Sequence, residues 1–111
     1  MIENLEILID RGDVDFMTNP SEENNFRING TAKGFGFPKN HVDLQCTESG
    51  PNTQCLISRH GFFSDYESNF KILVNPELVS HLKLTVMKGD LNLAHSGPIP
   101  ASFHFNLVKK N

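Results

Sequence analysis

Apolar and polar residues alternate one by one along most of this chain, and this period of two restricts the fold more than any other feature. The alternation is clear in LEILI (5–9), FRIN (26–29), LKLTV (82–86) and FHFNL (103–107). Successive side chains of a strand point to opposite faces, so the pattern is typical of strands with one buried face. Turn-forming clusters such as NPSEENN and GFGFPKN separate the stretches. The sequence therefore predicts an all-β fold.

One segment, PELVSH at 76–81, departs from this pattern, and two interpretations of it stay open. Asn75 could cap a helix there, and Pro76 suits the first helical position. An extended connector between two strands explains the segment equally well. The predicted fold therefore contains at most one short helical turn.

Length and composition are those of a single globular domain spanning 1–111. Hydrophobic residues make up 38% and charged residues 21%, which is enough apolar material for a core. The formal net charge is −3 and the ten Lys and Arg are scattered, which argues against nucleic acid as a partner. No apolar run approaches the ~20 residues of a membrane-spanning helix, so we expect no membrane insertion.

The first ten residues, MIENLEILID, carry acidic residues where a signal peptide has basic ones. No small-residue cleavage site follows them. We therefore expect either a cytosolic chain or a mature fragment whose leader is absent.

Two cysteines, Cys46 and Cys55, flank the turn-forming stretch TESGPNTQ. The flanking sequences look like strands, so the two thiols could face each other within disulfide reach. A disulfide would favour an extracytoplasmic or cell-surface location, whereas two reduced, partly buried thiols would suit the cytoplasm. Neither the cysteines nor the five histidines show metal-ligand spacing, so we predict no metal and no other cofactor.

The chain matches itself when it is shifted by 77 residues. LEILIDRGDVDF (5–16) falls on LKLTVMKGDLNL (82–93), and without a gap FRIN (26–29) then falls on FHFN (103–106). We interpret the match as an internal repeat of strand, Gly-Asp, strand, turn and strand. Glycine permits a bend, and the aspartate beside it can bond to nearby backbone N–H groups. The sequence thus predicts structural turns at Gly12, Asp13, Gly89 and Asp90.

The first Gly-Asp pair belongs to Arg11-Gly12-Asp13, the tripeptide that integrin ligands present on loops. Lys88 precedes the second pair, so the recurrence favours a backbone role for Gly-Asp. An adhesive role would need the tripeptide at an exposed loop tip, whereas here it lies between two apolar-alternating halves.

The same stretches resemble the bacterial adhesin β-repeat domains. ILVNPELVSHLKLTVMKGDLNL (72–93) has a proline lead-in, a strand, a Gly-Asp turn and a second strand, and LEILIDRGDVDF with NNFRINGTAKG resembles another copy. The resemblance implies a β-solenoid used for surface display or scaffolding, without catalysis. Residues 35–70 show no clear copy, and a solenoid needs about three stacked units. We therefore predict a compact antiparallel β-sandwich or short β-roll built from two related strand–Gly-Asp–strand units.

Candidate binding residues are mostly aromatic. Phenylalanines usually fill a core, but several exposed together would mark a protein interface. The segment SDYES adds hydrogen-bonding groups and the single Tyr of the chain, which suit a sugar or peptide ligand. The candidates are Phe35, Phe37, Phe62, Phe63, Asp65 and Tyr66.

No catalytic residue is predicted, because no serine or cysteine lies in a nucleophile elbow. Ser58 and His60 would share one face of a strand, but a triad needs a third orienting group. We predict a non-enzymatic interaction or structural domain of a surface, virion or scaffold assembly, with another protein or a second copy as its partner. The alternative is a small β domain that binds carbohydrate or peptide, or a hydrolase, using residues 58–66.

Overall fold

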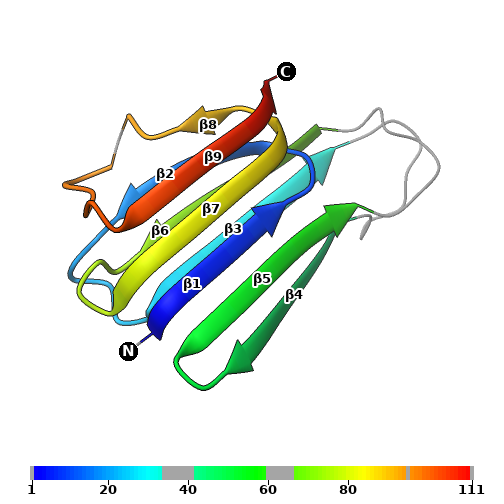
Figure 1. The fold of residues 1–111 in the computed structure, drawn as a ribbon. Coiled ribbons are helices and arrows are strands. Elements are labelled where there is room, and N and C mark those ends of the chain that lie inside the picture. The colour runs from blue at the N-terminus through cyan, green and yellow to red at the C-terminus, as the bar shows by residue number, and fades with distance from the viewer. Residues whose placement is uncertain (1, 34–41, 60–66, 95, 111) are drawn as a thin grey trace.

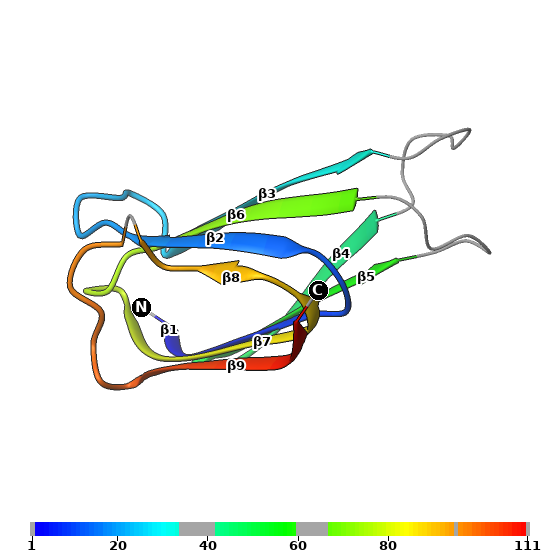
Figure 2. The same ribbon diagram turned by 90° about the horizontal axis from the view of Figure 1, so that it is seen from above.

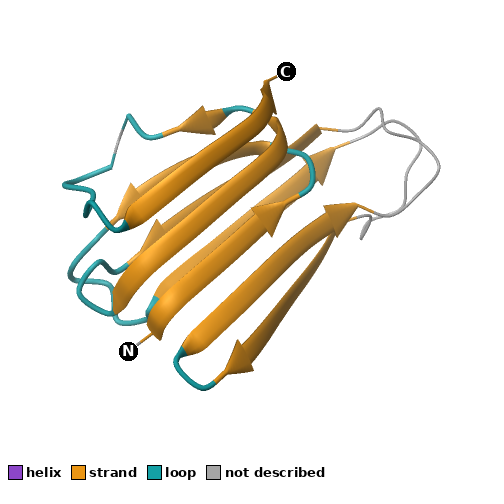
Figure 3. Ribbon diagram, in the orientation of Figure 1, coloured by secondary structure: helices purple, strands orange, loops and turns teal. Residues whose placement is uncertain are grey.

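The computed structural model describes residues 2–33, 42–59, 67–94 and 96–110, which contain nine strands and no helix (Figure 3). The prediction of an all-β fold is confirmed. The strands are β1 (Ile2–Ile9), β2 (Asp13–Thr18), β3 (Phe26–Lys33), β4 (Val42–Ser49), β5 (Asn52–Arg59), β6 (Glu67–Val74), β7 (Val79–Gly89), β8 (Leu91–Asn92) and β9 (Phe103–Lys110).

The strands form two sheets that lie one above the other (Figures 1 and 2). The five-stranded sheet has the order β4-β5-β1-β7-β9, and the four-stranded sheet has the order β3-β6-β2-β8. Seen from above in Figure 2, β8 and β2 lie over β9 and β7. This compact two-layer arrangement is that of a sandwich.

The core lies between the sheets and follows the alternation of the sequence. On β7, for example, Leu82, Leu84 and Val86 are buried while Lys83 and Met87 are exposed. Burying one face of each strand removes about 25 cal/mol of unfavourable hydration per Å² of apolar surface, which stabilises the sandwich. The largest fully buried side chains are Phe16, Leu5, Ile7, Ile9, Ile57, Ile72, Leu82, Leu84, Val14, Val74, Val79 and Val86.

The predicted antiparallel pairing is wrong for most of the molecule. Five of the seven strand pairings are parallel, and only β3–β6 and β4–β5 are antiparallel within the described residues. The reason is that the chain passes between the sheets at six of the eight connections between these strands, so consecutive strands usually lie in different sheets instead of pairing. Neighbours within a sheet come from separate passes that run in the same direction.

The N-terminal pair of strands is inserted between later passes of the chain. β1 lies between β5 and β7, and β2 lies between β6 and β8. The register of β1 on β7 pairs Leu5 with Leu82, and that of β2 on β8 pairs Val14 with Leu91. The two partners of each pair are 77 positions apart in the sequence. The segment from Leu5 to Val14 therefore has the same length as the segment from Leu82 to Leu91.

The third strands of the predicted repeat do not occupy equivalent places. β3 belongs to the four-stranded sheet and runs antiparallel to β6, whereas β9 belongs to the five-stranded sheet and runs parallel to β7. The match between FRIN and FHFN therefore reflects the alternation that all half-buried strands share.

The helical interpretation of 76–81 is wrong, because residues 76–78 form a turn and β7 begins at Val79. Buried Asn75 organises this turn: its Oδ1 accepts the N–H of Glu77 at 2.9 Å. Its Nδ2 donates to the carbonyls of Pro20 at 3.3 Å and Glu22 at 2.7 Å. One side chain thereby ties the β6–β7 turn to the β2–β3 connection.

Candidate functional site

The two Gly-Asp corners stack on each other, backbone against backbone. The N–H of Gly12 donates to the carbonyl of Lys88 at 2.9 Å, and the N–H of Asp90 donates to Oδ1 of Asp13 at 3.1 Å. Gly12 and Gly89 have φ of 153° and 152°, values that side-chain-bearing residues rarely adopt. A Cβ on Gly89 would overlap the carbonyl of Gly12. Glycine at this corner therefore allows the two chain segments to approach closely.

The Arg11-Gly12-Asp13 tripeptide forms part of these stacked corners. Gly12 is buried, and Arg11 and Asp13 are half-buried. The Asp13 carboxylate already accepts the N–H of Asp90. An integrin ligand presents its aspartate free at a loop tip, so this geometry favours a structural role for the tripeptide.

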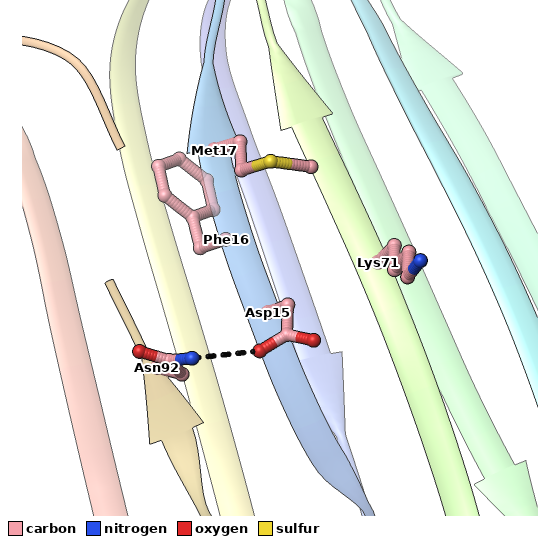
Figure 4. A pocket seen from close by; sticks show the side chains of 5 residues that line it. All are labelled: Asp15, Phe16, Met17, Lys71 and Asn92. Carbon is pink, nitrogen blue, oxygen red and sulfur yellow. Dashed lines mark hydrogen bonds between the residues drawn. The ribbon is translucent and has the colours of Figure 1, made fainter. Parts of the chain in front are cut away.

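A shallow hollow of about 150 Å³ lies over β2 and is lined by Asp15, Phe16, Met17, Lys71 and Asn92 (Figure 4). Nδ2 of Asn92 donates to Oδ1 of Asp15 at 3.1 Å, as the dashed line in Figure 4 marks. Oδ1 of Asn92 also accepts the N–H of Ala94 at 3.0 Å. Small-molecule sites usually enclose about 300–1,000 Å³, so this hollow is too small for a drug-sized ligand.

Within the part of the chain that the structure describes, no three His, Cys, Asp or Glu side chains gather as metal ligands would. The described residues also contain no helix with the length and hydropathy needed to cross a membrane.

The predicted binding residues Phe35, Phe37, Phe62, Phe63, Asp65 and Tyr66 lie outside the described residues, as does His60. Ser58 is half-buried on β5, next to the core residue Ile57 and on the opposite face of the sheet. Of the 58–66 region, the described residues include only Ser58 and Arg59.

Cys46 and Cys55 form a disulfide between paired positions of β4 and β5. Their Cα atoms are 4.1 Å apart, and Cys55 is buried in the core. The bridge links edge strand β4 to β5, its one neighbour in the five-stranded sheet.

Two leucines at opposite ends of the five-stranded sheet face the core side and are nevertheless exposed. Leu107 on β9 pairs with fully buried Val86, yet 36% of its surface is accessible. Leu44 on β4 pairs with buried Ile57, yet it is 47% accessible. β4 and β9 are the edge strands of this sheet, so within the described residues the core is open at both ends. We call Leu44 with β4 the β4 end, and Leu107 with β9 the β9 end.

Further apolar side chains lie on the outer face of the same sheet. Leu56 is 42% accessible and pairs with Leu8 of β1. Met87 and Val108 are 41% and 55% accessible, and the register of β7 on β9 places them side by side. Exposed apolar side chains thus lie on the outer face as well as at the two edge strands of the five-stranded sheet.

Sequence reasoning missed these five residues because alternation predicts which face a residue is on, but not whether another layer covers that face. Leu44 and Leu107 look like ordinary core positions in the sequence. Their exposure follows from the order of strands in the sheets. The exposure of these two leucines depends on their position at a sheet edge, which the sequence pattern of a single strand does not show.

Comparisons of the chain with protein-family models, with curated proteins and with solved structures find no match.

Proposed function

We propose that this chain is a non-enzymatic interaction or structural domain that joins an assembly through the two open ends of its five-stranded sheet. The assembly would be a surface, virion or scaffold structure. The observation that carries the proposal is the exposure of core-facing Leu44 and Leu107 at the edge strands β4 and β9.

An edge strand offers backbone N–H and C=O groups to an added strand, and exposed side chains on its core face add apolar contact area. Both edge strands are eight residues long. Natural proteins often shorten or cover such edges to avoid pairing. Two long edges beside exposed leucines are thus suited to strand addition.

The disulfide between Cys46 and Cys55 supports an oxidising, extracytoplasmic location for this role. The resemblance of the Gly-Asp stretches to bacterial adhesin β-repeats agrees with a role in surface display. β1 pairs in parallel with β7, and β2 pairs in parallel with β8, which supports the idea of two related strand–Gly-Asp–strand units.

Site-specific photo-cross-linking tests the proposed function. A photoreactive phenylalanine analogue would replace Leu44 or Leu107 in cells that produce the protein, with exposed Asn24 in the β2–β3 connection as the control position. We expect discrete cross-linked adducts from the two edge positions and none from position 24. Equal labelling at all three positions would overturn the proposal.

A further inference from the structure

The β4 end and the β9 end of the five-stranded sheet match each other in length, direction and charge. From these features we infer that the partner of each end is the opposite end of a second copy of this chain. The copies then join edge to edge in a head-to-tail row, with β9 of one copy beside β4 of the next. This inference rests on the proposed function and specifies its partner.

Strand direction permits the stacking without turning the second copy over. β5, β1, β7 and β9 run in one direction, and β4 alone runs in the other. A second copy shifted along the sheet therefore places its β4 antiparallel to the first copy's β9. Both strands have eight residues, and an antiparallel register that pairs Leu107 with Leu44 forms a ladder of seven residue pairs, from Phe103 with Glu48 to Lys109 with Val42.

The core faces of the two ends also become continuous in this arrangement. Leu107 and Leu44 both lie on the face that the sheet turns toward the core, as their paired residues Val86 and Ile57 show. When the sheets are joined edge to edge, the two leucines lie on the same face of one extended sheet. Each then covers apolar surface that the other leaves exposed.

The charges of the two edge strands are opposite. β9 has the sequence FHFNLVKK, with two lysines, one histidine and no acidic residue. β4 has the sequence VDLQCTES, with two acidic residues and no basic one. In antiparallel pairing Lys109 and Lys110 come beside the β4 end that begins at Val42 and Asp43. Opposite charges on adjacent strands stabilise a pairing, whereas β9 on β9 or β4 on β4 would join strands of like charge.

Light scattering coupled to size exclusion tests this inference with two blocked variants, Leu44→Lys and Leu107→Lys. Both leucines are more than one-third exposed, so the folded monomer should tolerate a lysine. Circular dichroism melting of each variant checks that it is folded. The wild type should form oligomers whose mass grows from micromolar to millimolar concentration.

Each variant alone should be monomeric, with self-association at least about tenfold weaker than in the wild type, a difference of ~1.4 kcal/mol. An equimolar mixture should contain a heterodimer of twice the 12.5 kDa chain mass and nothing larger. The heterodimer joins the unblocked β9 end of Leu44→Lys to the unblocked β4 end of Leu107→Lys, so both of its outer ends are blocked. A dimer formed by Leu44→Lys alone would mean that β9 pairs with β9. A dimer formed by Leu107→Lys alone would mean that β4 pairs with β4. Either result overturns the inference.

A wild type that stays monomeric at every concentration also overturns it. The proposed function is then judged separately by the cross-linking experiment. Adducts at Leu44 and Leu107 that contain a different protein would leave the proposed function standing and remove only the second copy as partner. Absence of edge adducts would remove both.

Discussion

Gly89 packs so closely on the backbone of Gly12 that a side chain there would collide with the Gly12 carbonyl. The φ of 152° is also unfavourable for any residue with a Cβ. We expect Gly89→Ala to lower the free energy of unfolding by about 3 kcal/mol or more, from backbone strain and overpacking together. Denaturant unfolding measures this loss.

The matched control for Gly89 is Gly50, in the turn between β4 and β5. Gly50 has a φ of 60°, and a Cβ there would meet nothing within 4 Å. Gly50→Ala should therefore cost only the roughly 1–2 kcal/mol of a left-handed residue. If the two substitutions cost the same, the close contact between the Gly-Asp corners does not limit stability.

Buried Asn75 holds two carbonyls of the β2–β3 connection, those of Pro20 and Glu22. Asn75→Asp keeps the size of the side chain but replaces the donating amide with oxygen, which would face both carbonyls. We expect a loss of about 2–4 kcal/mol in the free energy of unfolding, because buried acceptors lose their donor and a charge is buried. Thermal and denaturant melts measure it.

Exposed Asn19 provides the control for Asn75. Its Oδ1 accepts the N–H of Ser21 at 2.9 Å, and an aspartate could accept the same bond. Asn19→Asp should change stability by less than about 0.5 kcal/mol. A loss at position 75 no larger than this would contradict the bridging role of Asn75.

At the scale of elements, the disulfide is expected to stabilise the β4–β5 hairpin. The bond closes a short loop, with a sequence separation of 9 between Cys46 and Cys55. Such a loop predicts a loss of about 2–3 kcal/mol in the free energy of unfolding when the bond is reduced. Denaturant unfolding with and without reductant measures the loss.

The double variant Cys46→Ala with Cys55→Ala is the control for the disulfide. It should be about as unstable as the reduced wild type, and reductant should leave it unchanged. If reductant leaves the unfolding midpoint of the wild type unchanged, the disulfide does not stabilise the pairing of β4 with β5.

The sequence predicted elements more readily than their pairing. Alternation at 5–9 and 82–86 reveals β1 and β7, and the cysteine-flanked turn reveals β4 and β5. β6 was missed because its apolar residues Ile72, Leu73 and Val74 are consecutive and do not alternate with polar ones, although only Ile72 and Val74 of the three are buried. Parallel pairing was also missed, since a half-buried strand alternates in the same way beside either kind of neighbour.

The site depends even more on pairing than the fold does. Leu44 and Leu107 are exposed only because their strands end the sheet, and strand order is a property of the whole chain. The aromatic residues favoured by sequence, Phe35, Phe37, Phe62 and Phe63, lie outside the described residues. A local sequence pattern shows which face of a strand a residue lies on, but not which strands lie beside it in the sheet.

At the scale of the whole molecule, opposite charges on the edge strands predict that association weakens as salt is raised. Screening shortens from about 10 Å at 0.1 M to about 3 Å at 1 M ionic strength. Apolar contacts persist in salt, so we expect partial loss of oligomers. Sedimentation velocity at several salt concentrations measures this dependence.

The charge-reversed variant Lys109→Glu with Lys110→Glu serves as the control for the salt experiment. It should associate more weakly than the wild type at low salt, and added salt should strengthen its association instead. Association that salt strengthens in the wild type would indicate that apolar contact alone joins the copies.

Amide hydrogen exchange at low and high protein concentration shows whether the open sheet ends are association surfaces. We expect exchange to slow with concentration in β4 and β9 and to stay constant in the central strands β1 and β7, which are already paired on both sides. Edge strands whose exchange rates do not depend on concentration, in a protein that forms oligomers, would contradict this expectation.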